Sequence, residues 1–138
     1  MSKLVVIDDD PVDHFVMKHL LHGRNYFETT TFTTYSSLVT EYIAEHHDEP
    51  DKLPDVIFLD LNMPGYDGWQ FLEDMMEMQR DLSKNIGVYV LTSSVRVQDM
   101  EKANRYPFVR SFLSKPLQPQ IIEQIANRQP AYAKMNLQ

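Results

Sequence analysis

The feature that most constrains the fold is a short apolar run, 56–59, which ends on Asp60 and leads into a Pro-Gly turn. A continuous apolar run between turn signals is typical of a strand that is buried on both faces, as in a parallel sheet. A carboxylate at the end of such a strand has to face a crevice, because burying an unpaired charge is very unfavourable. Open α/β sheets bind their ligands just outside the carboxyl ends of the strands. Asp60 is therefore the first candidate for chemistry.

The rest of the chain alternates between predicted strands and predicted helices. Apolar or threonine-rich runs predict strands, and apolar residues at helical spacing predict the helices between them. Further strands are expected at 4–7, 26–32, 86–91 and 109–113, and helices near 11–22, 36–45, 69–76, 95–105 and 117–128. Five strands alternating with five helices predict a parallel sheet covered by helices on both faces. We therefore expect one doubly wound α/β domain over residues 1–128 and a short polar tail, 129–138.

The first predicted helix has clear signals at both ends. Asp10 stands where an N-cap is expected, Pro11 occupies the first helical position, and Gly23 ends the helix. The spacing of its apolar residues predicts a core-facing stripe that consists of Val12, Phe15, Val16, His19 and Leu20. Because Asp10 is explained as a cap, the two preceding aspartates remain without a structural role.

Composition narrows the classes of function. The net charge of -7 argues against a nucleic-acid surface and favours a cation or a basic partner. The chain has no cysteine, so disulfides, thiolate metal sites and cysteine nucleophiles are excluded. No secretory signal opens the chain and no apolar run approaches the length that a membrane crossing needs. We expect a soluble cytoplasmic protein that binds neither DNA nor membranes.

Four of the five predicted strands end in polar side chains that can take part in chemistry: Asp8 and Asp9, Asp60, Thr92, and Lys115. In a flavodoxin-like sheet of strand order 2-1-3-4-5, the first and third strands, which carry the carboxylates, are neighbours at the topological switch point. Carboxylates that share a crevice repel one another unless a cation joins them, and a set of oxygen ligands suits Mg²⁺. Together with a lysine and a hydroxyl, these groups predict phosphoryl transfer to an aspartate.

These segments resemble the receiver domain of two-component response regulators. The similar segments are Asp8-Asp9, the turn 60–64 (Asp-Leu-Asn-Met-Pro), Thr92-Ser93 and Lys115-Pro116. They follow one another in the expected order and spacing, and the resemblance covers roughly residues 2–127. Each segment alone is a weak signal, whereas the four together are highly specific.

The resemblance implies a stand-alone receiver that acts as a phosphorylation-gated switch. Asp60 would accept a phosphoryl group from a phosphohistidine of a sensor histidine kinase or of a histidine phosphotransfer protein. The protein would catalyse only its own phosphorylation and dephosphorylation. Asp9 would ligate Mg²⁺ directly, Asp8 mainly through water, and Asn62 through its backbone carbonyl, with Asp60 as a further ligand.

The resemblance also implies a way for the phosphoryl group to act on the protein surface. Thr92 would hydrogen-bond one phosphoryl oxygen and Lys115 would pair with another, and the Lys115-Pro116 peptide bond is expected to be cis. Phe112 lies where receivers carry the aromatic residue that swings inward when the threonine moves. A downstream protein would bind the face formed by the fourth helix, fifth strand and fifth helix, and the chain would be a monomer or a phosphorylation-dependent dimer.

Two features depart from the family pattern. Phe112 lacks the hydroxyl of the commoner tyrosine, so the switch would work by packing alone. The segment 104–110, which contains Tyr106 and Phe108, replaces the usual small Ala/Gly turn. These two aromatic residues are interpreted either as an exposed partner patch or as the packing of an edge strand.

Two other classes of function compete with this interpretation. A phosphatase of the haloacid dehalogenase type also uses a strand-terminal aspartate and magnesium, but it needs a second aspartate two residues later as acid and base. That position is Asn62, which does not serve in that way. The other alternative is a degenerate receiver that works only as a docking module without being phosphorylated.

Overall fold

The computed structural model describes residues 2–61, 68–93 and 96–127. Within them the five strands form one parallel sheet in the order β2-β1-β3-β4-β5, as predicted. The strands are β1 (Lys3–Ile7), β2 (Thr29–Thr33), β3 (Val56–Asp60), β4 (Gly87–Thr92) and β5 (Val109–Ser114). The helices are α1 (Pro11–Leu21), α2 (Ser36–Glu45), α3 (Gly68–Met78), α4 (Val97–Ala103) and α5 (Pro119–Asn127), with a 3₁₀ turn, η1 (Gln79–Asp81), after α3.

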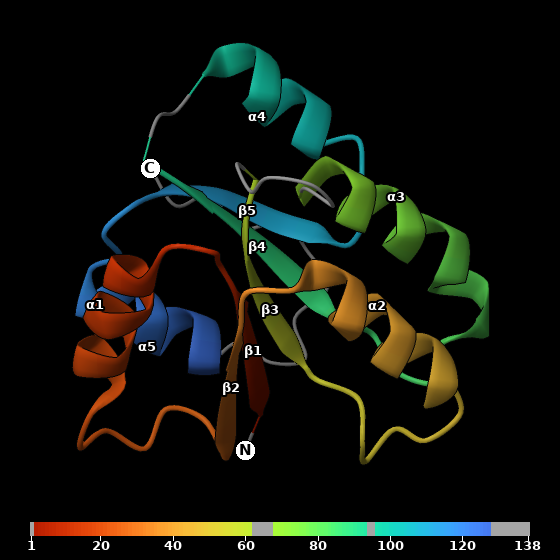
Figure 1. The fold of residues 1–138 in the computed structure, drawn as a ribbon, viewed down its shortest axis with the longest axis horizontal. Coiled ribbons are helices and arrows are strands. Elements are labelled where there is room, and N and C mark those ends of the chain that lie inside the picture. The colour runs from red at the N-terminus through yellow and green to blue at the C-terminus, as the bar shows by residue number, and fades with distance from the viewer. Residues whose placement is uncertain (1, 62–67, 94–95, 128–138) are drawn as a thin grey trace.

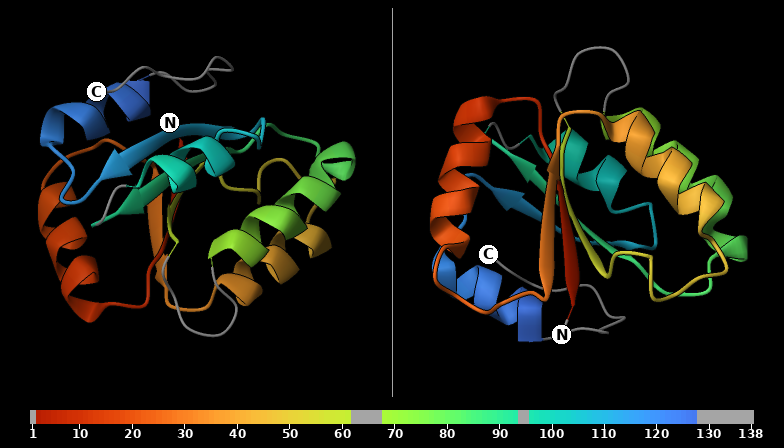
Figure 2. Two further views of the ribbon diagram at one scale, coloured as in Figure 1. Left: turned by 90° about the horizontal axis from the view of Figure 1, so that it is seen from above. Right: turned by 60° about the horizontal axis from the view of Figure 1, so that its bottom comes forward.

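Helices cover both faces of the sheet, with α1 and α5 on one side and α2 and α3 on the other (Figures 1 and 2). Successive strand residues point to opposite faces, and each face has its own apolar cluster. Val56 and Phe58 of β3 join Met17 of α1 and Ile122 of α5 in one cluster. The cluster on the other face contains residues from β3, α2, α3 and α4, among them Ile57, Leu59, Ile43, Phe71 and Ala103. The result is a sandwich of three layers, with β3 buried along its whole length at the centre.

Helix α1 is rotated relative to the sequence prediction. Its N-terminal cap is as predicted, since the Asp10 carboxylate accepts a hydrogen bond from the backbone N–H of Val12 at 2.9 Å. The predicted core stripe is wrong except at Leu20, however, because Val12 is 65% and Phe15 72% exposed. Val16 and His19 are exposed as well.

The face of α1 that packs against the apolar cluster of Val56 and Phe58 contains Met17, Leu20 and Leu21. Asp13 lies one turn before Met17, so it shares this face. At the other end of the helix, Gly23 has a φ of +72°, a left-handed conformation that suits glycine just after a helix end.

The segment between α4 and β5 packs into the core. Tyr106 and Phe108 are both buried in the cluster beneath α3 and α4, so packing, and not an exposed patch, explains these two aromatic residues. The Tyr106 hydroxyl donates a hydrogen bond to Glu73 of α3. Burial, with the hydrogen bond to Glu73 and its charge, raises the pKa of Tyr106 to about 12.

A second contact joins α4 to α3. The ammonium of Lys102 lies 4.2 Å from the ring centroid of Trp69, within the range of a cation–π interaction.

Within the described residues, no helix combines the length and the apolar character that a bilayer crossing requires.

Candidate functional site

Three carboxylates meet at the carboxyl edge of the two central strands. Asp8 and Asp9 follow β1, and Asp60 ends β3, its hydrogen-bonded neighbour. One carboxylate oxygen from each residue lies within 4.8 Å of the others. Asp8 is only 4% and Asp60 8% exposed, whereas Asp9 is half-buried. The structure thus brings together the three aspartates that the sequence places at this edge.

The local backbone explains why these side chains converge. The Asp8 carboxylate accepts a hydrogen bond from the backbone N–H of Asp10 at 2.9 Å, which orients Asp8 at the start of α1. On the other side, α3 begins directly against the end of β3, because Gly68 lets the two backbones approach closely. A Cβ atom on Gly68 would lie 2.6 Å from the Cα of Leu61 and 2.8 Å from the carbonyl oxygen of Asp60. Glycine at position 68 is therefore required for this geometry.

Lys115 supplies the positive charge of the site. Its Nζ donates to Asp8 at 2.7 Å and lies 3.5 Å from the Asp60 carboxylate. The peptide bond between Lys115 and Pro116 is cis, as expected. Burial by itself would lower the pKa of the ammonium, but hydrogen bonds to Asp13 and Asp8 and the charge of Asp60 outweigh it and raise the pKa above its ordinary value. The side chain therefore remains charged at neutral pH.

Asp13 is a site residue that the sequence analysis did not identify. Its carboxylate accepts a hydrogen bond from Lys115 Nζ at 2.6 Å, and its side chain is 31% exposed. The available signal was its place four residues after Asp9, in the first turn of a helix that starts at the carboxyl edge of the sheet. An acidic residue in the first turn of a helix is ordinarily explained by its favourable interaction with the helix dipole. There was therefore no separate reason in the sequence to expect that Asp13 contacts Lys115.

The two expected switch residues lie on the neighbouring strands β4 and β5. Thr92 ends β4 and is buried, and its carbonyl oxygen accepts a hydrogen bond from the backbone N–H of Lys115 at 2.8 Å. Phe112 of β5 lies opposite Val90 and packs partly buried against the cluster that contains Ala103 of α4. Asn62, the expected backbone ligand, lies outside the described residues, as does the rest of the turn, 63–65.

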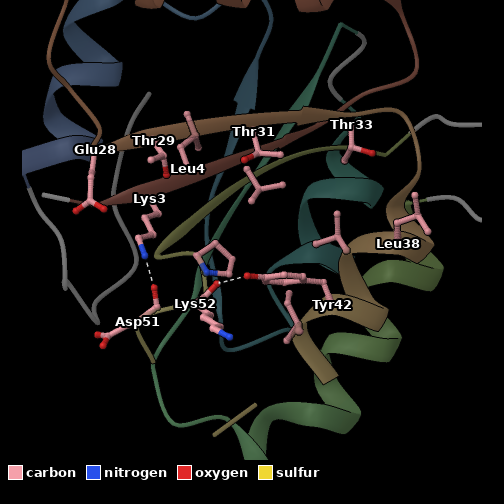
Figure 3. Close-up of a pocket in the computed structure, with 14 residues that line it drawn as sticks. Lys3, Leu4, Glu28, Thr29, Thr31, Thr33, Leu38, Tyr42, Asp51 and Lys52 are labelled. Carbon is pink, nitrogen blue, oxygen red and sulfur yellow. Dashed lines mark hydrogen bonds between the residues drawn. The ribbon is translucent and has the colours of Figure 1, made fainter. Parts of the chain in front are cut away.

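A hollow of about 390 Å³ opens beside the carboxylates. Its lining includes Asp8, Asp60 and Lys115, together with Asp13 and Ser93. A larger groove of about 540 Å³ lies elsewhere, between the edge of the sheet and α2 (Figure 3). Its lining combines the threonines of β2 with apolar residues of α2 and includes Thr29, Thr31, Thr33, Leu38 and Tyr42. Because it contains none of the three clustered carboxylates, we place the candidate chemistry in the smaller hollow.

The charges of the site are suited to an additional cation and an anion. Three aspartates within 4.8 Å repel one another, and one ammonium group offsets only part of that repulsion. Carboxylate oxygens at this spacing are ligands that hard divalent cations prefer. With such a cation beside Lys115, a dianionic group on Asp60 would meet balancing positive charge. The arrangement is thus chemically competent for phosphoryl transfer to a carboxylate.

Comparison with known families assigns the chain to a class. The sequence model of the response regulator receiver domain family matches residues 4–127. The chain therefore belongs to the response regulator receiver domain family. No curated protein matches the chain at a significant level.

Solved structures share the fold. A two-component response regulator from Cytophaga hutchinsonii superposes with a TM-score of 0.80 at 24% identity, over 91% of this chain and 94% of that chain. The phosphorylated cyanobacterial phytochrome response regulator RcpA has a TM-score of 0.71 at 22% identity, over 96% of each chain. The Mn²⁺-bound form of response regulator Rcp1 has a TM-score of 0.68 at 19% identity, over 100% of this chain and 99% of that chain. These likenesses support the receiver fold.

Proposed function

We propose that this protein is a phosphorylation-gated switch in which Asp60 is the phosphoacceptor. The observation that carries the proposal is the convergence of Asp8, Asp9 and Asp60 within 4.8 Å, with Lys115 Nζ 3.5 Å from Asp60. Asp60 ends a strand that is buried along its whole length, and it lines the hollow from which a donor would approach. Membership of the receiver family supports the same role.

The proposed transfer is a displacement at phosphorus. A carboxylate oxygen of Asp60 attacks the phosphorus of a phosphohistidine, and a P–O bond forms as the P–N bond breaks. The departing imidazole nitrogen keeps the electron pair and takes up a proton from water. The product on Asp60 is an acyl phosphate, whose added negative charge lies beside the ammonium of Lys115.

The three aspartates fit a divalent cation. Asp8, Asp9 and Asp60 would hold Mg²⁺, and the carbonyl of Asn62 remains the expected fourth protein ligand. A bound divalent cation supplies positive charge that stabilises the phosphoryl oxygens during transfer. The Mn²⁺-bound form of Rcp1, a response regulator of the same fold, supports a divalent ion in this protein as well.

The proposed switch runs from the site to the far edge of the sheet. Thr92 would turn toward a phosphoryl oxygen, and Phe112 would move into the space behind it. Because Phe112 contacts the cluster beneath α4, this movement would change the face made of α4, β5 and α5. A ligand shifts such an equilibrium only by its different affinity for the two states.

The partners follow from this role. The donor would be a sensor histidine kinase or a phosphotransfer protein, and a downstream protein would bind the face of α4, β5 and α5. We further propose a cytoplasmic protein that does not bind DNA and is a monomer or a phosphorylation-dependent dimer.

Family membership removes the support for the haloacid dehalogenase alternative, because the chain matches the receiver family over residues 4–127.

The test is labelling by a small phosphodonor. Wild-type protein is incubated with Mg²⁺ and acetyl phosphate, and the added mass is located by peptide mass spectrometry. We expect the label on Asp60, and we expect Asp60→Asn to abolish it. Asp81→Asn, which removes an exposed carboxylate in η1, is the charge-matched control and should label normally. Undiminished labelling of Asp60→Asn at another residue would refute the assignment, and an unlabelled wild type would favour the docking module.

A further inference from the structure

Lys115 has an acidic partner that the proposed transfer does not use. Its Nζ lies 2.6 Å from Asp13 and 2.7 Å from Asp8, whereas the Asp60 carboxylate is 3.5 Å away. An ammonium group has three N–H donors, and the two short hydrogen bonds go to carboxylates other than the phosphoacceptor. Lys115 is therefore held mainly by Asp8 and Asp13 in the structure.

The fold fixes the position of Asp13. Asp13 lies on the face of α1 that packs on the protein through Met17 and Leu20, and all three residues line the same hollow as Lys115. The Lys115 side chain is 15% exposed and that of Asp13 is 31% exposed. A pair shielded to this extent is screened less by salt than a fully exposed pair.

The shared ammonium creates a competition. Phosphoryl oxygens that develop on Asp60 need a positive partner at the position where Lys115 lies 3.5 Å from the carboxylate. The ammonium that would pair with them is the one that Asp13 and Asp8 hold at 2.6 Å and 2.7 Å. A carboxylate is a stronger acceptor than a neutral amide, so the charge on Asp13 opposes a move of the ammonium toward Asp60.

We propose that Asp13 is a positioning residue that holds the Lys115 ammonium away from Asp60 in the resting protein and thereby slows phosphorylation. This inference rests on the proposed role of Asp60 as phosphoacceptor. Asp13 acts through Lys115, whose ammonium it contacts at 2.6 Å.

The first test compares rates of labelling at Asp60. With Mg²⁺ and phosphoramidate as donor, we expect Asp13→Asn to be phosphorylated about fivefold faster than the wild type, the size that a partly shielded ion pair implies. Asp13→Glu keeps the charge and should remain within about twofold of the wild type. Glu41→Gln removes an exposed charge on α2 and should not change the rate. A rate for Asp13→Asn equal to or below that of a normally labelled wild type would overturn the proposal.

A second comparison separates positioning from a general field effect. Removing a negative charge also weakens the repulsion of an anionic donor, but that effect grows with donor charge and fades in high salt. Positioning predicts a similar acceleration with phosphoramidate and with the more highly charged acetyl phosphate, and the acceleration persists in high salt. An acceleration confined to acetyl phosphate at low salt would contradict the role assigned to Asp13.

A third measurement does not depend on phosphorylation. Nitrogen NMR of the lysine side chains should show a slowly exchanging Lys115 ammonium in the wild type and in Asp13→Glu, and faster exchange in Asp13→Asn. This readout remains valid even if Asp60 is never labelled, so a failure of the phosphoacceptor proposal is distinguishable from a failure of the Asp13 proposal. An unchanged Lys115 signal in Asp13→Asn would show that Asp13 does not hold the ammonium.

Discussion

The Tyr106 hydroxyl donates a hydrogen bond to the carboxylate of Glu73, and this contact joins the segment that precedes β5 to helix α3. Together with the cation–π contact between Lys102 and Trp69, it connects the region of α4 to the helix that begins beside Asp60. A change at Asp60, the proposed phosphoacceptor, would therefore meet packed contacts toward the α4 region through α3 as well as through β5.

Tyr106→Phe should destabilise the protein by about 1–2 kcal/mol, because the Glu73 carboxylate loses its donor in a partly buried setting. The free energy of unfolding from urea titration measures the effect. Tyr35→Phe, which changes a 65% exposed tyrosine, is the control and should be close to neutral. Equal stabilities of the two variants would show that the Tyr106 contact contributes nothing.

The same tyrosine predicts a loss of stability in alkali. The pKa of Tyr106 is about 12 in the folded protein, above its ordinary value of 10.0, so the folded state holds the proton more tightly than the unfolded state. This contribution is fully present below about pH 10 and is lost as the pH rises toward about 12. Denaturation at a series of pH values should show a steeper alkaline decline for the wild type than for Tyr106→Phe. Parallel declines would contradict the raised pKa.

Lys102→Gln should change the fluorescence of Trp69, because it removes an ammonium that lies 4.2 Å from the ring. Trp69 is the one tryptophan of the chain, so the signal is assigned without ambiguity. The stability should fall by about 0.5 kcal/mol, as expected for an exposed cation–π pair. Arg105→Gln removes a neighbouring exposed charge and should leave the emission spectrum unchanged. Identical spectra for Lys102→Gln and the wild type would rule out the contact in solution.

Mg²⁺ should raise the melting temperature of the wild type. At ten times its dissociation constant, a ligand that binds only the folded state stabilises it by about 1.4 kcal/mol, or about 5 °C for a chain of this size. Asp9→Asn should lose most of this response and should melt higher than the wild type in chelator, because one of three mutually repelling carboxylates is gone. Thermal unfolding with and without chelator tests both effects. An undiminished Mg²⁺ response of Asp9→Asn would exclude Asp9 as a ligand.

The observed rotation of α1 predicts opposite outcomes at two apolar positions. Met17→Ala should cost about 2 kcal/mol or more, because Met17 is buried against the sheet. Phe15→Ala should change stability by no more than about 0.5 kcal/mol, because Phe15 is 72% exposed. The reverse order in urea titrations would restore the stripe predicted from the sequence.

The sequence predicted the sheet well because its central strands are buried on both faces. In the sequence, such strands are continuous runs of mainly apolar residues. β3 and β4 are buried at every position. The carboxylate site followed directly, because Asp8 and Asp9 come just after β1 and Asp60 ends the neighbouring strand β3. The cis bond before Pro116 was expected only from the family resemblance.

The rotation of α1 and the contact of Asp13 were beyond the sequence signal. Two faces of α1 carry apolar residues at helical spacing, so periodicity alone did not decide which of them packs. Lys115 lies 102 residues after Asp13 in the chain and contacts it in the fold. Tyr106 likewise contacts Glu73, 33 residues earlier in the chain. Side-chain pairs this distant in the chain leave no local pattern.

Strand β2 has a consequence for the behaviour of the protein at high concentration. It is the outermost strand on its side of the sheet, and none of its residues, Thr29–Thr33, is charged. Charged side chains and prolines are what usually prevent an outer strand from accepting a strand of another molecule. Here the net charge of -7 keeps copies apart at long range, and dissolved salt weakens that repulsion. The colloidal stability of this protein therefore depends on ionic strength more than on any local protection of its outermost strand.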